Sequence, residues 1–361
     1  MTRPTICLNM IVKDEAHVIA RCLASVRPLI TRWCIVDTGS TDGTEAAIRQ
    51  ALEGVPGTLH SRPWRNFGHN RSEALELARA ERCDYLLFID ADELFEAPAE
   101  FVWPEMHADS YELNCNYGDM RYARRALVST RLPWRWVGVL HEYLDCNLPH
   151  SVEALPAPTV LIHHDGARAH DPGTYLKDIA ILESALRDEP GNTRNVFYLA
   201  QSYRDAGRLA EARATYQRRA TMGGWDEEVW YAMFQVAVLS ERLAAPPAEV
   251  AAGYLAAFNA RPSRAEPLVE LARYHRLRGV NGVAYLYAKH AAELPLPPDR
   301  LFVDRASYQW RALDELAISA FYVGTAEARA TGAAAARRLV SEAAAPDDER
   351  SRLQRNLGYY L

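Results

Sequence analysis

Residues 85–93 read YLLFIDADE, and this stretch decides the fold. Its apolar run is short for a core helix and indicates a buried strand that ends at the carboxylate of Asp90. The preceding residues Arg71–Ala80 space their apolar side chains as one face of a helix does. Strand and helix therefore alternate here, which is typical of a parallel sheet with right-handed crossovers.

The same alternation runs back to the start of the chain. The expected elements are strand Ile6–Ile11, helix Glu15–Val26, strand Cys34–Asp37, a helix that begins at Asp42, and a weaker strand Leu59–Trp64. Further on the apolar segments become shorter, which indicates a mixed edge of the same sheet together with loops. These segments are Ser110–Asn116, Ala126–Arg131, Trp136–Leu144 and Thr159–His163. We expect an α/β domain over residues 1–172, and the turn-like stretch that ends at Gly173 marks its boundary.

Residues 173–361 have a different composition, rich in Ala, Leu, Arg and Glu. A tetratricopeptide-type pattern with a 34-residue period fits from Thr193, again from Ala265, and more weakly from Trp310. One helical hairpin cannot bury its apolar face, so stacked hairpins must share a core. The second part is therefore predicted as an all-α solenoid of three or four repeat units.

Overall composition limits the possible functions. The chain has 361 residues and a formal net charge of −6, which argues against a protein that lives on nucleic acid. No apolar run approaches the roughly 20 residues of a membrane-spanning helix. The first residues carry charge too early for a signal peptide. The six cysteines show no CxxC spacing, so we expect reduced, mostly buried thiols in a cytoplasmic protein.

Carboxylates follow two of the expected parallel strands. Asp37 ends the second strand, and Asp90 and Asp92 follow the fourth. Because ligands bind beyond the carboxyl ends of parallel strands, the three residues should share one rim. Alternate residues of an extended segment point the same way, so Asp90 and Asp92 could face one Mg²⁺ or Mn²⁺ that also holds a phosphate. The alternative is that Asp92 and Glu93 cap a following helix.

The small-residue loop from Asp37 to Thr44 joins a strand to a helix. Its backbone N–H groups could hold an anion, or the Asp37 carboxylate could bind a ribose hydroxyl or a base N–H. The plainer alternative is a helix cap. The loop matches neither GxGxxG nor the lysine-containing phosphate loop, so neither of those nucleotide folds is supported.

Three ordered motifs carry a family resemblance: TICLNMIVKDEAHVIARCLASV, CIVDTGSTDGT and YLLFIDADE. Over roughly residues 4–165 the chain resembles the family 2 glycosyltransferases, in particular bacterial members with tetratricopeptide helices after the catalytic domain. The resemblance implies a GT-A fold with a mostly parallel sheet. It also implies an inverting mechanism, a UDP-linked or similar sugar donor, and Mn²⁺ or Mg²⁺ as cofactor.

The resemblance also assigns donor-binding residues. The loop after the first strand would border the nucleobase through Asn9, Val12, Lys13 and Glu15. Asp37 would contact the nucleoside. Arg71, in the stretch NFGHNRSEA, would be the arginine on the nucleotide side, although the order Asn70-Arg71 departs from the family's more usual Ala-Arg-Asn. Asp90-Ala91-Asp92 would meet the metal and the diphosphate, with Asp92 as the more direct ligand.

An inverting transfer needs a base for the acceptor proton. The aromatic segment from Trp134 to Tyr143 contains a His-Glu pair, as relatives do in this region. Glu142 is the predicted base, with His141 or Asp145 as substitutes. Trp134 and Trp136 either stack on a sugar or base, or simply pack a strand.

A late histidine near the metal is a feature of several GT-A families. His163 and His164 follow the last expected strand, and one of them could complete the coordination of Mn²⁺. Alternate side chains of a strand face opposite ways, so only one of the two should do so, and His163 is the one assigned.

The combined prediction is a metal-dependent glycosyltransferase of hexosyltransferase type. Its acceptor would be a glycan, a peptide or a lipid-linked molecule, with the helical repeats offering a concave surface for the acceptor or for a second copy of the chain. One alternative is a catalytically inactive nucleotide-binding protein that acts as an interaction module. Another is a sugar nucleotidyltransferase, which would need a basic Gly-rich phosphate loop where this chain offers only Lys13.

Overall fold

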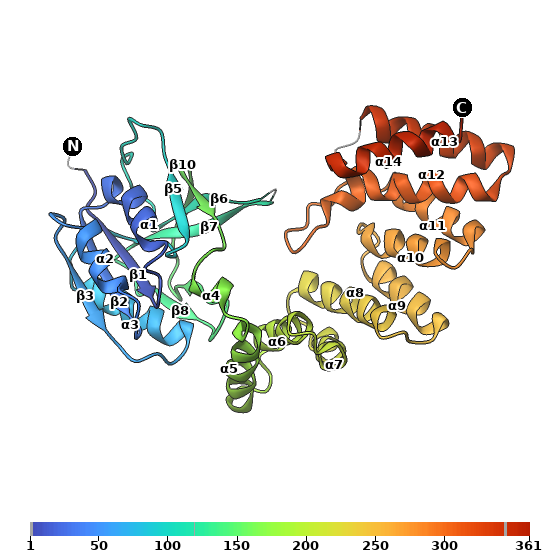
Figure 1. Cartoon of the computed structure of the whole chain (residues 1–361). Coiled ribbons are helices and arrows are strands. Elements are labelled where there is room, and N and C mark those ends of the chain that lie inside the picture. The colour runs from blue at the N-terminus through green and yellow to red at the C-terminus, as the bar shows by residue number, and fades with distance from the viewer. Residues whose placement is uncertain (1–2, 119, 343–344) are drawn as a thin grey trace. The chain divides into compact units, whose positions relative to one another are not determined.

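The computed structural model describes residues 3–118, 120–342 and 345–361. These residues form two compact units, Met1–Pro190 and Gly191–Leu361 (Figure 1). The helix α5 (Thr174–Asp188), which follows the boundary expected at residue 173, belongs by its contacts to the first unit. The first unit is a mixed α/β domain and the second is wholly helical among its described residues.

An eight-stranded sheet in the order β3-β2-β1-β4-β7-β6-β10-β5 forms the centre of the first unit (Figure 1). Its strands are β1 (Ile6–Val12), β2 (Arg32–Asp37), β3 (Gly57–Ser61), β4 (Tyr85–Phe88), β5 (Glu93–Glu96), β6 (Ser110–Tyr117), β7 (Met120–Ser129) and β10 (Val152–Ile162). The first four strands are parallel, and the rest form the mixed edge expected from the sequence. This confirms the predicted fold class.

Helices cover both faces of the sheet because the strands are apolar on both sides. The helices that cover the sheet are α1 (Ile19–Val26), α2 (Thr44–Ala51) and α3 (Phe67–Arg79). A 3₁₀ turn at Arg27–Leu29 follows α1, and the short helix α4 (Ala167–His170) follows β10. Ile6, Leu8 and Met10 pack in the core that includes α1 and α2. Cys7, on the opposite side of β1, packs in the core that includes α3.

The segment Trp136–Leu144, expected to belong to the mixed edge of the main sheet or its loops, contributes instead to two short strands outside that sheet. β8 (Arg135–Val137) and β9 (Tyr143–Asp145) pair with each other in a separate two-stranded sheet. A turn with positive φ at Gly138 (101°) and His141 (51°) joins them. The apolar residues in this turn resemble those of a strand, so the sequence alone does not indicate the change of chain direction. Glu142 lies at the end of the turn, directly before β9.

The cysteines and the hydropathy of the helices both bear on expectations from the sequence. All six cysteines are free and buried, as expected. In the described part of the chain, no helix is long and apolar enough to cross a membrane.

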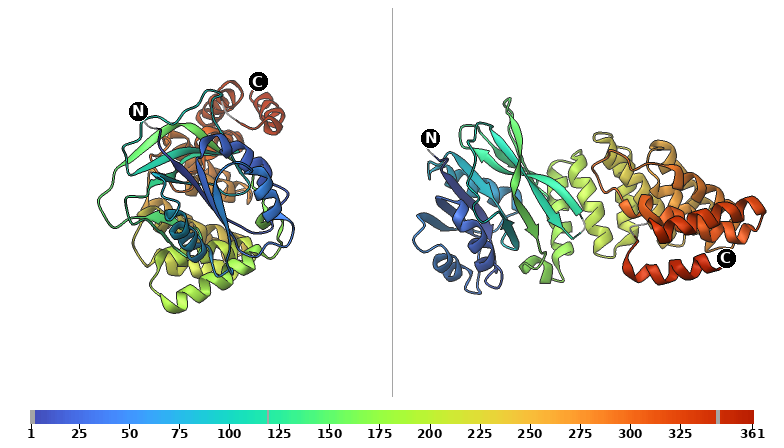
Figure 2. Two further views of the ribbon diagram at one scale, coloured as in Figure 1. Left: turned by 90° about the vertical axis from the view of Figure 1, so that its left-hand side faces the viewer. Right: turned by 90° about the horizontal axis from the view of Figure 1, so that it is seen from above.

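The second unit is built from antiparallel helix pairs stacked one on the next (Figure 2). Its elements are α6 (Thr193–Asp205), α7 (Leu209–Ala220), α8 (Asp226–Arg242), α9 (Pro247–Ala260), α10 (Glu266–Arg276), α11 (Asn281–Glu293), a π-helical turn Ser307–Arg311, α12 (Ala312–Val323), α13 (Ala326–Ser341) and α14 (Asp347–Gly358). Buried alanines such as Ala272, Ala288 and Ala336 let the helices approach closely. The predicted tetratricopeptide-like repeat architecture is confirmed.

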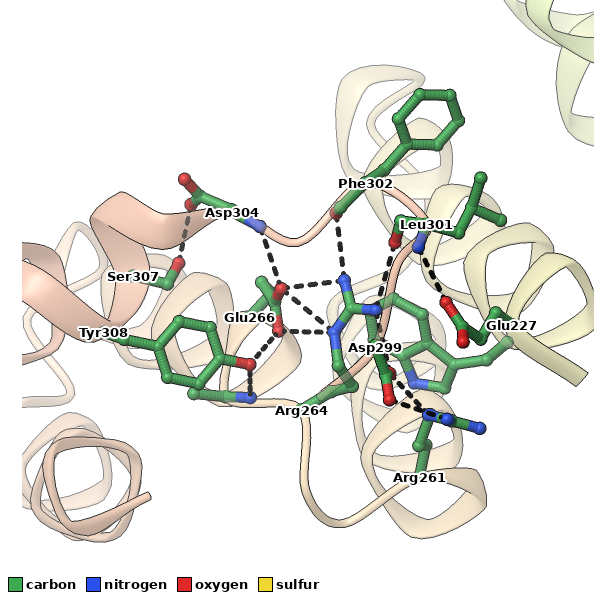
Figure 3. A network of polar contacts seen from close by, with 12 residues as sticks. Glu227, Arg261, Arg264, Glu266, Asp299, Leu301, Phe302, Asp304, Ser307 and Tyr308 are labelled. Carbon is green, nitrogen blue, oxygen red and sulfur yellow. Dashed lines mark hydrogen bonds and ion pairs between the residues drawn. The ribbon is translucent and has the colours of Figure 1, made fainter. Parts of the chain in front are cut away.

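One buried arginine organises the loop between α11 and α12 (Figure 3). Arg264 is fully buried, and its guanidinium donates to both carboxylate oxygens of Glu266 and to Asp299. It also donates to the carbonyl oxygens of Leu301 and Phe302, which lie in the loop itself. The loop is therefore held by a network in which each buried charge has a partner.

Replacement of Arg264 by Ala should leave the Glu266 carboxylate buried without its counter-charge. Loss of one partner of a buried pair typically costs about 3–5 kcal/mol of stability. We expect the thermal unfolding transition of the helical unit to fall by many degrees. The matched control is Arg350→Ala, which removes an exposed ion pair with Asp347 and should leave the transition unchanged. Equal melting temperatures for the two variants would contradict this account of the network.

Candidate active site

The candidate site lies at the carboxyl edge of the parallel strands. β1 pairs in parallel with both β2 and β4, so the ends of these three strands face the same way. Asp37 is the last residue of β2 and stands opposite Val12, and Asp90 follows two residues after β4 ends. The structure thus places the predicted carboxylates along one rim.

Asp37 is almost fully buried and uses one of its two oxygens locally. Its Oδ1 accepts from the backbone N–H groups of Gly39 and Ser40, both at 2.8 Å. Thr41 N–H donates to Asp14 instead. The carboxylates of Asp37 and of Asp14, in the loop after β1, therefore occupy several of the N–H groups that could hold an anion. Asp37 Oδ2 is buried and has no hydrogen-bond partner among the described residues, so it is an acceptor available for a donor group.

Asp90 and Asp92 lie in a tight turn rather than in an extended segment. The Glu93 N–H donates to the Asp90 carbonyl at 3.1 Å, which closes the turn before β5 begins. The expectation that alternation along a strand aligns the two aspartates is therefore wrong, and so is the alternative of a helix cap. Each carboxylate has its own partner, and these partners come from different parts of the domain.

Arg71 lies between Asp90 and Glu142. Its Nη2 donates to Asp90 Oδ1 at 2.5 Å, and its Nε lies 2.5 Å from Glu142 Oε1. Although desolvation opposes ionisation, Arg71 and then Arg124 hold the pKa of Asp90 below its ordinary value. The Arg71 guanidinium thus links Asp90, on the predicted diphosphate side of the site, to Glu142, on the predicted acceptor side.

The two tryptophans of β8 and the turn before it pack within the domain. Trp134 is buried, and its indole N–H donates to the Ser129 carbonyl. Trp136 packs edge to face on Phe88 and lies under the Arg71 guanidinium, 5.0 Å from the ring centre. Of the two interpretations left open by the sequence, the structure favours packing, and Trp136 supports Arg71.

A close contact between two glycines brings Arg71 and Glu142 together. Gly68 lies in the first turn of α3, three residues before Arg71, and a Cβ added there would lie 1.9 Å from the Gly138 carbonyl oxygen. Gly138 begins the turn that carries Glu142. Sequence reasoning missed this contact, although Gly68 within NFGHNRSEA and Gly138 within WVGVLHE were visible as isolated glycines.

Replacement of Gly68 by Ala should push the 138–142 turn away from α3 and separate Glu142 from Arg71. We expect a loss of stability of about 1–3 kcal/mol, as for other overpacked sites, measured by chemical unfolding. Gly282→Ala is the control, because a Cβ at Gly282 in α11 meets no atom within 4 Å. If both variants unfold at the wild-type denaturant concentration, the contact does not constrain the turn.

Glu15 and Asp92 are bound by neighbouring backbone groups of one segment. The Gly166 N–H donates to Asp92 Oδ2 at 3.3 Å, and the Ala167 N–H donates to Glu15 Oε2 at 3.1 Å. A Cβ at Gly166 would lie 3.1 Å from that Asp92 oxygen and 3.2 Å from that Glu15 oxygen. Only a residue without a side chain fits easily between the two carboxylates.

Burial raises the pKa of Glu15 to about 7, against the opposing effect of the Ala167 N–H. The negative charges of Asp92 and Asp90 raise it further, while His17 lowers it. Glu15 therefore belongs electrostatically to the same site as the two aspartates.

The raised pKa of Glu15 has a defined effect on stability. The folded protein keeps this proton up to about pH 7, whereas a free glutamate releases it near pH 4.5, so the folded state binds more protons in between. This contribution to stability is present below pH 4.5 and is lost as the pH rises through 7. We expect the melting temperature of the wild type to fall relative to Glu15→Gln across this interval, in buffers without divalent cations. A constant difference between the two proteins from pH 4.5 to 8 would show that the carboxyl is not shifted.

Several predicted donor-site residues are buried instead. Asn9 donates through Nδ2 to the carbonyls of Cys34 and Ala74, so its amide joins β1 to β2 and α3. Val12 and Ala91 are buried in the main core. Lys13 is exposed. Asn9, Val12 and Ala91 can support the rim, and their side chains do not line it.

The two asparagines before Arg71 stabilise the start of α3 through hydrogen bonds. Asn66 caps α3 by accepting from the His69 N–H at 2.8 Å. Asn70 is fully buried and bonds to the Arg65 N–H and the Pro63 carbonyl. Arg71 is the polar residue of this stretch that reaches the rim carboxylates.

The predicted histidines are exposed. The pKa of Asp165 is lowered mainly by its hydrogen bond with Arg21, with a smaller contribution from His163. The ring of His164 lies 4.9 Å from the ring of Tyr117. In the described structure, no hydrogen bond or ion pair joins His163 to Asp90 or Asp92. The substitute bases differ: Asp145 pairs with Arg135, and His141 is an exposed residue of the turn before Glu142.

The carboxylates of the rim fit a hard divalent cation in part. One oxygen of Asp90 is engaged by Arg71 and one oxygen of Asp92 by Gly166, so the second oxygen of each carboxylate has no hydrogen-bond partner among the described residues. Carboxylate oxygens are the ligands that Mg²⁺ and Mn²⁺ prefer. Within residues 3–118, 120–342 and 345–361, no three acidic, histidine or cysteine side chains are already clustered as a metal site. An ion bound here would therefore take further ligands from a diphosphate or water.

Comparison with known proteins agrees with this geometry. Residues 7–99, which span β1 to the end of the Asp90–Glu93 turn and β5, match the model of Glycosyl transferase family 2. The chain has a family 2 glycosyltransferase domain at its N-terminus and a tetratricopeptide-like helical region after it. The resemblance to this family that the sequence motifs indicate is thereby confirmed.

Relatives in sequence include a repeat-containing protein and glycosyltransferases. A TPR repeat-containing protein of Synechococcus elongatus is 28% identical over 309 residues, which cover 79% of this chain and 74% of that protein. The glycosyltransferase SunS of Bacillus subtilis is 26% identical over 55% of this chain and 49% of its own length. The lipopolysaccharide core biosynthesis glycosyltransferase LpsC of Rhizobium meliloti is 34% identical over 30% of this chain. The chain thus spans about half of SunS and 37% of LpsC.

Among solved structures, a tetratricopeptide repeat protein of Parabacteroides merdae matches 53% of this chain and 70% of its own, with 18% identity and a TM-score of 0.38.

Proposed function

We propose that the chain is an inverting, metal-dependent glycosyltransferase that moves a hexose from a UDP-linked donor to an acceptor glycan or polypeptide. The family assignment supports the reaction class. The observation that carries the finer proposal is the Arg71 guanidinium between Asp90 and Glu142. This arrangement joins a leaving-group side and an acceptor side within the length of one side chain.

The donor nucleoside would lie against β2 and the loop after β1. Asp37 Oδ2 is buried and lacks a hydrogen-bond partner among the described residues, so a base N–H or a ribose hydroxyl would satisfy it. A carboxylate at this position suits a donor group of the nucleoside, as acidic residues after strands do in other nucleotide-binding sheets.

The diphosphate would lie at the Asp90–Glu93 turn. Asp90 and Asp92, with Glu15 beside them, would hold Mn²⁺ or Mg²⁺, and this cation would neutralise the charge that develops on the departing diphosphate. Arg71 contributes a fixed positive charge next to Asp90. Its pKa is raised by Asp90 and Glu142 against the effect of burial, so it stays charged at any working pH.

Glu142 would act as the base. In the transfer, an acceptor X–H group gives its proton to the Glu142 carboxylate, and X forms a bond to the anomeric carbon. The bond from that carbon to the diphosphate oxygen breaks, and its electron pair leaves with the nucleoside diphosphate. Attack opposite to the leaving group inverts the anomeric configuration. The side chain of Glu142 is only 8% exposed, so Arg71 orients it in a largely dry environment.

Metal-dependent release of UDP from UDP-sugars tests this proposal, with water as the acceptor. Asp92→Asn should lower the rate at least about 100-fold, as expected when an electrostatic stabiliser of the leaving group is removed. Asp348→Asn, an exposed carboxylate of α14, is the matched control and should keep the wild-type rate. Removal of divalent cations should reduce the wild type to the level of Asp92→Asn.

Two outcomes would replace the proposal. Equal background rates for wild type and Asp92→Asn over a panel of nucleotide-sugars would favour an inactive interaction module. Release of pyrophosphate from a nucleoside triphosphate and a sugar phosphate would favour a nucleotidyltransferase.

A further inference from the structure

An ion pair between a buried carboxylate and a partly exposed arginine supports the turn that carries Asp90 and Asp92. Glu93 is 3% exposed, and its Oε1 and Oε2 accept from the two terminal nitrogens of Arg124 at 2.8 and 2.6 Å. The Glu93 Oε2 also accepts from the Asp90 backbone N–H at 3.0 Å. Since the Glu93 N–H donates back to the Asp90 carbonyl, both polar backbone groups of Asp90 are fixed by Glu93.

The strand register explains why Arg124 reaches this turn. β7 runs antiparallel to β4, with Tyr85 opposite Ser129 and Leu87 opposite Leu127. β4 ends at Phe88, but β7 continues beyond it. Arg124 lies three residues farther along β7 than Leu127, the last residue of β7 that pairs with β4, and its guanidinium contacts Glu93 in the turn. Arg124 therefore stands where the turn leaves the sheet, and nothing about YLLFIDADE alone indicates an arginine some thirty residues later.

Resting on the proposed function, we propose that Glu93 and Arg124 are positioning residues for the donor diphosphate site. Arg124 fixes the Glu93 carboxylate, Glu93 fixes the backbone of Asp90, and the turn in this conformation presents the Asp90 and Asp92 carboxylates to a cation and a diphosphate. Asp90 is then held at two points, by Glu93 at its backbone and by Arg71 at its side chain. Neither Glu93 nor Arg124 needs to touch the substrate.

A role in positioning differs from a role in stability alone. Replacement of a buried ion pair by apolar residues of similar size is often neutral or stabilising for the fold. Such a replacement here would keep the domain folded but would remove the acceptor of the Asp90 N–H. A pair that served only stability would leave the function of this double variant intact.

The test uses the full chain with the double substitution Glu93→Leu and Arg124→Met. Arg219 and Glu228 form a control ion pair in the helical unit, in which Arg219 is fully buried and its Nη2 lies 2.9 Å from Glu228 Oε2. The control double variant is therefore Glu228→Leu with Arg219→Met. Arg124→Lys, which keeps the charge but loses the two-pronged geometry, serves as a conservative variant if the double variant folds poorly.

Three quantities are measured for each protein: the exchange rate of the Asp90 amide proton, the affinity for UDP in the presence of Mn²⁺, and the affinity for uridine without metal. We expect the Glu93/Arg124 double variant to exchange the Asp90 amide at least about 10-fold faster, because that N–H has lost its acceptor. Its affinity for UDP with Mn²⁺ should fall at least about 10-fold, while its affinity for uridine stays at the wild-type value. Arg124→Lys should lie between, and the control double variant should match the wild type in all three.

The outcomes separate this inference from the proposed function. A folded Glu93/Arg124 variant with wild-type affinity for UDP and Mn²⁺ overturns the inference and leaves the proposed function intact. A wild-type protein that binds neither UDP with Mn²⁺ nor uridine contradicts the proposed function. In that case the exchange of the Asp90 amide decides alone whether the pair holds the turn, and an unchanged rate overturns the positioning role.

Discussion

The position of the Arg71 guanidinium between the Asp90 and Glu142 carboxylates is the interaction on which the rest of the candidate site depends. Two carboxylates that flank one side chain would repel each other in a partly buried site. The positive charge of Arg71 between them offsets this electrostatic repulsion. The elements around Arg71 serve this arrangement. α3 carries it, Trp136 lies under it, and the bare backbone of Gly68 lets the turn with Glu142 approach α3.

The Asp92 side of the site is supported in a similar way by backbone groups. The segment after β10 returns to the rim, where Gly166 and Ala167 donate to Asp92 and Glu15. Glycine fits best here too, because a Cβ at Gly166 would lie 3.1–3.2 Å from the two carboxylates. The candidate site is therefore assembled from five separated parts of the chain: the loop after β1, the turn after β4, the start of α3, the segment after β8 and the segment after β10. Its acidic groups are held by Arg71 and Arg124 and by neutral N–H groups, so one edge of the sheet can carry several carboxylates.

The sequence was sufficient for the parts of the fold that depend on local patterns. Ile6–Val12, Tyr85–Phe88 and the helices between them follow from apolar periodicity, and the repeats of the second unit follow from small residues at a fixed period. It was not sufficient where long-range contacts decide the conformation. The sequence pattern around Asp90 indicates an extended segment, whereas the turn at Asp90–Glu93 depends on the contact between Glu93 and Arg124 on a distant strand. The pairing of β8 with β9 could not be predicted either, because the apolar residues between them do not show that Gly138 must pass beside Gly68. The family resemblance places Asn9 next to the nucleobase, whereas in the structure its amide nitrogen donates to backbone carbonyls of β2 and α3.

The central claim is that the Asp90–Glu93 turn and Asp37 together hold a nucleoside diphosphate and a divalent cation. A crystal of the full chain grown with UDP and Mn²⁺, with diffraction recorded at a wavelength where manganese scatters anomalously, tests it most directly. The account predicts one anomalous peak beside the Asp90 and Asp92 carboxylates, with the diphosphate on its far side and the nucleoside against Asp37. A well-ordered UDP bound elsewhere, or a peak remote from both aspartates, would contradict it.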